Sequence, residues 1–206
     1  MTTWDQGLAL LYKGGIMIIP ILFFSFLTIS IGVERWLVYR KARSNGLKSW
    51  YEVKEHLLQG RMEEARRICQ ENESAIAAIM GKGFDYYKKE KLFILRDVLE
   101  GAVAAQVASL RLRMSYLSTI VTVAPLLGLL GTVVGMIQTF NVLAVASGQP
   151  NAVTGGVGEA LISTAAGLVV AITAMLLHSY FSEWLETMIS DMETVVNGII
   201  ESLGRD

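Results

Sequence analysis

Three polar side chains that can hold or pass a proton stand inside apolar stretches of this chain: Thr132, Glu159 and Thr164. A hydroxyl both donates and accepts hydrogen bonds, and a carboxylate can take up a proton, so such groups can line a path for a cation. Ionisable residues inside membrane segments are costly and are functional by default. The functional interpretation of Glu159 is therefore a carboxylate at the mouth of an ion path.

Each of these side chains also has a structural alternative. A threonine in a membrane helix can bond the backbone carbonyl one turn before it and do nothing more. Glu159 is the only charged residue between Met114 and Ser182. It stands in the first turn of a predicted span, where a carboxylate can also cap a loop or reach the interface. The residues alone leave both alternatives open.

Small residues surround the two threonines at helical spacing. Helices in lipid have no hydrophobic drive to associate, so close contact depends on small side chains. We therefore expect these residues to pack helices together and to line a pore. The first stripe holds Pro125, Gly128, Thr132, Gly135 and Thr139, with Gly131 beside it, and the second holds Ala160, Thr164, Gly167, Ala171 and Ala174.

Long uncharged runs determine the fold class. The chain is 52% hydrophobic with a mean hydropathy of +0.45, and a membrane helix needs roughly 20 apolar residues. The run that starts at Gly14 supplies one span, and the run after Met114 supplies two, separated by a loop rich in Gly, Pro and Asn. The sequence predicts an all-α polytopic protein with three transmembrane helices at 15–38, 115–144 and 157–180 and a loop at 145–156.

The positions of Lys and Arg predict the orientation. Sixteen of the eighteen basic residues fall between Arg35 and Arg113, and cytoplasmic loops are the ones that carry this excess. We expect an N-terminus outside the cytoplasm, a cytoplasmic helical region at 39–114 and a cytoplasmic amphipathic helix at 181–206. Residues 1–14 fit a helix that lies on the outer surface of the membrane, with a frayed terminus as the alternative.

Helical patterns continue on the cytoplasmic side. A hairpin is predicted with its turn at Gly60. No Pro interrupts the chain from about Lys91 to Pro125, which predicts one helix that runs from the cytoplasm into the second span. The apolar stripe over 181–200 predicts that the third span also extends into the cytoplasm.

Other candidates for chemistry are weak. His178, at the cytoplasmic end of the third span, fits a polar helix end better than a proton carrier. His56 and Cys69 lack metal-ligand spacing, and Ser163 lies fifteen residues from His178, too far for a nucleophile and its base. The chain also has no phosphate loop. We expect no enzyme activity, no cofactor, no resident metal and no nucleic-acid partner.

Two segments carry a resemblance to a known family. "APLLGLLGTVVGMIQTF" (124–140) and "GEALISTAAGLVVAI" (158–172) resemble the paired signature of the MotA/TolQ/ExbB proton-channel family, and the three-span plan resembles its ExbB/TolQ branch. The resemblance implies that the family's channel threonines fall on Thr132 and Thr164 and its glutamate on Glu159. It also implies a homopentamer around two copies of a single-span, ExbD- or TolR-like partner, whose membrane Asp carries H⁺, or Na⁺ as the alternative.

The residues agree with the need for such a partner, because no Asp, Lys or Arg lies at the middle of any predicted span. The resemblance implies a motor subunit that uses the proton motive force to energise a periplasm-spanning protein such as TonB or TolA, which drives transport across the outer membrane. The alternatives are Tol-type envelope maintenance, a gliding motor, a self-sufficient ion channel and a passive membrane scaffold.

Overall fold

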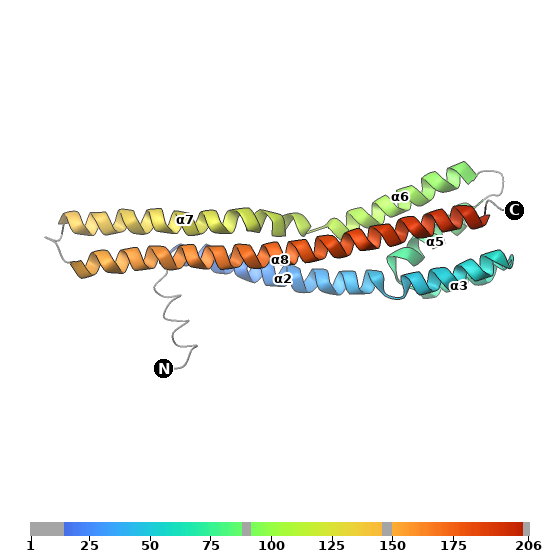
Figure 1. The fold of residues 1–206 in the computed structure, drawn as a ribbon, viewed down its shortest axis with the longest axis horizontal. Helices are drawn as coiled ribbons and strands as arrows, with labels where there is room; N and C mark the ends of the chain where they lie inside the picture. The colour runs from blue at the N-terminus through green and yellow to red at the C-terminus, as the bar shows by residue number, and fades with distance from the viewer. Residues whose placement is uncertain (1–14, 88–91, 146–149, 204–206) are drawn as a thin grey trace, which may run out of the picture. The chain divides into compact units, whose positions relative to one another are not determined.

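A computed structural model describes residues 15–87, 92–145 and 150–203, and all regular structure in these ranges is α-helical. The predicted all-α class is confirmed, and the helix predicted at 1–14 lies outside the described residues. The helices in chain order are α2 (Ile18–Arg43), α3 (Gly46–Leu58), α4 (Met62–Glu71), α5 (Ala75–Tyr86), α6 (Leu92–Arg111), α7 (Met114–Val145) and α8 (Pro150–Leu203) (Figure 1).

Three helical stretches are long and apolar enough to cross a membrane. They lie at Ile18–Leu58, Phe93–Asn141 and Gly155–Leu203, and their most apolar windows have mean hydropathies of 1.7, 2.2 and 2.3. Each predicted span overlaps one of them. The chain is therefore a polytopic membrane protein with three membrane-spanning helices, as predicted.

The chain divides into two compact units, and the first contains most of the predicted membrane segments. Unit 1 comprises residues up to Val33 together with Arg113–Ser179. In this unit α7 and the first part of α8 run side by side (Figure 1), and α2 packs on both. Large apolar side chains cover the outside of the unit, as expected for helices that face lipid. Its core consists of Ile21, Ile120, Ala124, Val170, Ala171 and Ala174.

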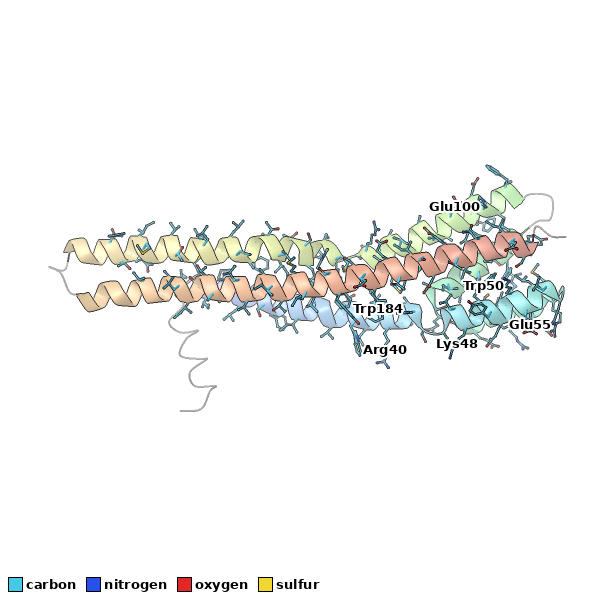
Figure 2. All side chains as sticks on the ribbon, in the orientation of Figure 1. Arg40, Lys48, Trp50, Glu55, Glu100 and Trp184 are labelled. Carbon is cyan, nitrogen blue, oxygen red and sulfur yellow. The ribbon has the colours of Figure 1, made fainter. Side chains whose placement is uncertain are left out.

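Unit 2 comprises Glu34–Leu112 and the chain from Tyr180 onward. The predicted hairpin is present as α3 and α4, and Gly60 makes its turn with a φ of 72°. Trp50 of α3 is 3% exposed and its ring contacts Gly198 of α8, where any side chain would displace it (Figure 2). The apolar stripe of the α8 tail is buried in this unit through Phe181, Leu185, Met188, Met192, Val195 and Ile199.

One expectation about the second long helix is wrong. The structure divides the predicted continuous helix into α6 and α7, with Arg113 in the left-handed region at a φ of 65°. The carbonyl oxygen of Leu110 accepts hydrogen bonds from Arg35 Nη1 at 3.1 Å and from the Tyr39 hydroxyl at 3.0 Å. These side chains of α2 satisfy a carbonyl at the end of α6, so a break costs less there than in an isolated helix.

The helix that contains the third predicted span begins at Pro150, seven residues before the predicted start of the span at 157. Proline is favoured at the first position of a helix, where its missing N–H is not needed. Gly155 and Gly156, which helped to predict the loop, are instead part of the helix, and Gly156 contacts the hydroxyl of Thr139. Residues 150–156 of the predicted loop are thus helical.

The single cysteine gives a test of unit 2. Cys69 is 5% exposed, and burial raises the pKa of its thiol to about 12. Because the thiolate is the reactive form, we expect N-ethylmaleimide at pH 7.5 to leave Cys69 unmodified in the folded protein and to modify it fully after denaturation. Intact-mass spectrometry measures both states. Rapid labelling of the folded protein would show that α4 does not pack as described.

Candidate functional site

The backbones of α7 and α8 touch in unit 1 at two glycines. A Cβ atom on Gly167 would lie 2.6 Å from the carbonyl oxygen of Ala124 and 3.1 Å from Cα of Gly128. A Cβ atom on Gly128 would in turn lie 3.0 Å from Cα of Thr164. Since these neighbours are backbone atoms, no side-chain rotation could relieve the overlap. Glycine at both positions is what lets the helices approach so closely.

The close contact continues toward the start of α8. A Cβ atom on Gly135 would lie 3.0 Å from Cβ of Ala160, and one on Gly131 would overlap the hydroxyl of Ser163. Four of the glycines on these stripes thus contact the neighbouring helix within one chain: Gly128, Gly131, Gly135 and Gly167. Gly128, Gly131, Gly135, Thr139, Ala160, Gly167 and Ala171 are buried, whereas Pro125 is half-buried inside an unbroken α7. Pore lining by these residues stays a prediction.

The two predicted channel threonines make different hydrogen bonds. Thr164 donates from its hydroxyl to the carbonyl oxygen of Gly128 across the helix contact, at 2.9 Å. Thr132 donates to the carbonyl oxygen of Leu129 in its own helix, at 2.6 Å. Both side chains are half-buried. Thr164 thus links α7 to α8 by a hydrogen bond. Thr132 instead bonds a carbonyl of its own helix, as in the structural alternative described for a threonine in a membrane helix.

This bonding determines which further hydrogen bonds the two hydroxyls can make. A hydroxyl that donates to a carbonyl still has lone pairs free to accept a hydrogen bond. Thr132 and Thr164 can therefore accept from a protonated carboxylic acid as they stand. To stabilise an ionised carboxylate, either hydroxyl must rotate away from its carbonyl and donate. In the observed geometry each hydroxyl can thus accept a hydrogen bond from a protonated carboxyl group. Either hydroxyl can donate to a carboxylate only after it has rotated.

Glu159 has a different surrounding. Its carboxylate contacts Gly15, just before the first turn of α2, and Gly15 has a φ of 65°. Glu159 also lines a small cavity with Gly131, Gly135 and Gln138 of α7. The side chain is half-buried and lies where the beginning of α2 meets α7 and α8. Neither Thr132 nor Thr164 lines the cavity that Glu159 lines.

Sequence analysis did not assign two residues to this helix contact, Ser163 and Gln138. Ser163 is 1% exposed, contacts Gly131 and donates a hydrogen bond to the carbonyl oxygen of Ala160 at 2.9 Å. It lies three residues after Ala160 and four before Gly167, so the helical spacing of the second stripe could have identified it. Gln138 lines the Glu159 cavity and lies three residues after Gly135. Its polarity near the end of an apolar span was the available signal.

The weaker candidates stay apart from this site. His178 is half-buried on α8, and Nδ1 of His56 lies 3.1 Å from a carboxylate oxygen of Glu64 in unit 2. Across the described ranges, no three or more His, Cys, Asp or Glu side chains gather as metal ligands would.

Backbone-to-backbone packing of long apolar helices, with hydroxyl groups at the contact, is typical of a multi-pass α-helical membrane protein. The sequence profile of the MotA/TolQ/ExbB proton channel family matches residues 71–194, which include α7 and most of α8. The chain belongs to this family. It is a family of proton channels and not a family of enzymes.

Individual relatives agree with this assignment. The biopolymer transport protein ExbB-like 3 of Synechocystis sp. is 30% identical over 184 residues, which cover 82% of this chain and 81% of the relative. ExbB-like 1 of the same organism is 33% identical over 171 residues, which cover 80% of this chain and 66% of the relative. ExbB of Xanthomonas campestris is 34% identical over 137 residues, or 66% of this chain and 53% of the relative.

Proposed function

We propose that this chain is the channel subunit of an inner-membrane motor. In this proposal several copies, five by the family resemblance, surround a single-span, ExbD- or TolR-like partner that carries an Asp in its membrane helix. Proton flow through the complex drives movement of a periplasm-spanning protein such as TonB. Envelope maintenance of the Tol type and gliding are alternative outputs of the same machine.

One observation carries the proposal. The described part of unit 1 has hydroxyls that can bind an ion carrier, but it has no Asp, Glu, Lys or Arg at the middle of a predicted span. Thr132 and Thr164 lie half-buried on α7 and α8, and Glu159 is the only charged residue between Met114 and Ser182. Glu159 lies near the beginning of α8, where the carboxylate contacts Gly15. A group that loads and releases a proton at the middle of the membrane must therefore come from a second protein.

The bonding of the two threonines suggests how such a partner would move. A protonated Asp is neutral, so it can pass the apolar faces of α7 and α8 and donate to either hydroxyl. After deprotonation the carboxylate is stabilised only where a hydroxyl has rotated to donate to it. Moving one elementary charge through the membrane field releases about 2.3 kcal/mol per 100 mV. Repeated loading and release would thus convert the proton gradient into stepwise motion.

The test is proton flux in liposomes under an imposed membrane potential. The chain is purified alone and together with an ExbD- or TolR-like single-span protein. We expect little flux from the chain alone, strong flux from the complex, and loss of that flux when the partner's membrane Asp is changed to Asn. Flux from the chain alone at the level of the complex would contradict the proposal and favour a self-sufficient channel.

A further inference from the structure

A cavity of about 200 Å³ in unit 2 lies where the end of α2, the first turn of α3, α5 and the tail of α8 meet. Its apolar lining comes from Ala42, Leu47, Ile76, Met188 and Met192. Three charged side chains complete the lining: Arg43, Lys48 (Figure 2) and Asp191. Because Arg43 and Lys48 are exposed and Asp191 is half-buried, solvent reaches the cavity from the side where these charges lie.

The turn between α2 and α3 forms one wall of the cavity. Asn45 has a φ of 53°, in the left-handed region that Asn adopts more readily than most residues. Gly46 then packs on α5, where a Cβ atom would lie 3.1 Å from Cδ1 of Ile76 and 3.2 Å from the Ser74 hydroxyl oxygen. The same hydroxyl caps α5 by accepting a hydrogen bond from the Ala77 N–H at 3.2 Å. Backbone conformation and packing therefore hold this wall, and the charged side chains are not needed for it.

The three charged side chains have no ion-pair partner within the described part of the chain. No carboxylate there lies within 4.0 Å of the Arg43 guanidinium or of Lys48 Nζ, and no basic nitrogen lies that close to the Asp191 carboxylate. Lys41, two residues before Arg43, does have a partner, since Nζ lies 2.7 Å from a carboxylate oxygen of Glu73. Two cations and one anion thus surround one space and are not neutralised by the protein itself.

The cavity lies at the depth of the lipid headgroups. The predicted first span ends at residue 38, and α2 continues without a break to Arg43. Four more residues at 1.5 Å each place Ala42 about 6 Å beyond the hydrocarbon core. Each headgroup layer of a bilayer is about 5–7 Å thick. Trp36, one turn and a half before Ala42, is 43% exposed, and Trp is enriched at this interface.

We propose that this cavity binds the headgroup of a phospholipid that carries both a phosphate and a primary ammonium group, an assignment that does not depend on the proposed function. Arg43 and Lys48 donate hydrogen bonds to the phosphate oxygens, which guanidinium and ammonium groups bind strongly. The Asp191 carboxylate accepts hydrogen bonds from the lipid ammonium group. The apolar lining contacts the glycerol and the first acyl carbons.

The sign of each charge makes the site selective. A headgroup with a phosphate and no ammonium group would bring a negative charge to Asp191 with nothing to neutralise it, and such like-charge contacts reject a ligand. A headgroup with a trimethylated ammonium group has no N–H to donate to the carboxylate. The cavity is therefore expected to prefer phosphatidylethanolamine to phosphatidylglycerol and to phosphatidylcholine.

The experiment measures lipid binding to the full-length, delipidated chain in detergent by native mass spectrometry. The probes are these three lipids with identical acyl chains. The double variant Arg43→Gln, Lys48→Gln removes both charged donors to the phosphate, so we expect the affinity for phosphatidylethanolamine to fall at least tenfold. Asp191→Asn has a different expected effect. It should weaken phosphatidylethanolamine binding about tenfold and strengthen phosphatidylglycerol binding, which reverses the preference.

The matched controls are Lys54→Gln on α3 and Glu193→Gln on α8, because neither residue lines the cavity. Both should leave all three affinities unchanged, and circular dichroism verifies that each variant is helical. Equal phosphatidylethanolamine binding by the double variant and the unaltered chain would overturn the site. An unchanged lipid preference in Asp191→Asn would overturn the role of the carboxylate. Soluble phosphoethanolamine that displaces the lipid at equal concentration would show a site for a free phosphate ester and overturn the lipid assignment.

Discussion

Gly167→Leu is expected to prevent stable pairing of α7 with α8, so that the protein does not accumulate in the membrane. A single added Cβ atom would already lie 2.6 Å from the carbonyl oxygen of Ala124, and the atoms it meets are backbone atoms of α7. Leucine adds three further carbon atoms at the same point. The helices would have to separate along the contact that also holds Gly128 and the Thr164 hydrogen bond. Membrane-fraction immunoblots and circular dichroism of the purified protein measure the outcome.

Gly167→Ala provides the graded version of this test. Overpacking costs about 1–3 kcal/mol, and the better helix propensity of alanine offsets about 1 kcal/mol of it. The matched control is Gly158→Ala in the same helix, because an added Cβ atom at Gly158 meets nothing within 4 Å. We expect Gly167→Ala to lower the unfolding midpoint in an SDS titration and Gly158→Ala to leave or raise it. The reverse order would contradict the described contact.

Thr164→Val is expected to abolish proton flux through the complex while leaving the fold intact. Valine reproduces the branched shape and removes only the hydroxyl that donates to Gly128 at 2.9 Å. An interhelical hydrogen bond in a membrane contributes about 0.6 kcal/mol on average, so the loss of stability should be small. If the hydroxyl receives the partner's carboxyl group, its removal should lower flux about 100-fold.

Thr164→Ser is the control, because serine keeps the hydroxyl and should preserve most of the flux. Assembly with the partner is measured by co-purification for both variants. A passive scaffold makes the opposite prediction, since its function requires only assembly. Normal flux in Thr164→Val, and in Thr132→Ala as a second site, would therefore exclude these hydroxyls from the ion path.

Sequence reasoning succeeded where local spacing determines the structure. The small residues recur every three or four positions, and the same period brings Gly128 and Gly135 of α7 onto the Thr164 and Ala160 face of α8. Uncharged runs of sufficient length likewise determined the three membrane helices. In both cases the signal is periodicity or length, which needs no knowledge of distant contacts.

The features that were missed depend on distant contacts. The segment around Arg113 contains no Gly or Pro, and the break between α6 and α7 involves the bonds of Arg35 and Tyr39 to the Leu110 carbonyl. The different bonding of Thr132 and Thr164 could not be predicted either. Both residues lie on similar stripes, and only the arrangement of α7 and α8 decides which hydroxyl reaches the other helix. The partner of Glu159 is a glycine more than one hundred residues away.

The backbone contact between α7 and α8 has an electrical consequence. Gly128 and Gly167 bring the two helices so close that no file of water can run between them within one subunit. Protons that cross the complex must therefore pass outside the contact at these two glycines. We therefore expect a cell that makes the subunit in excess of its partner to keep its membrane potential, because the subunit alone does not conduct protons.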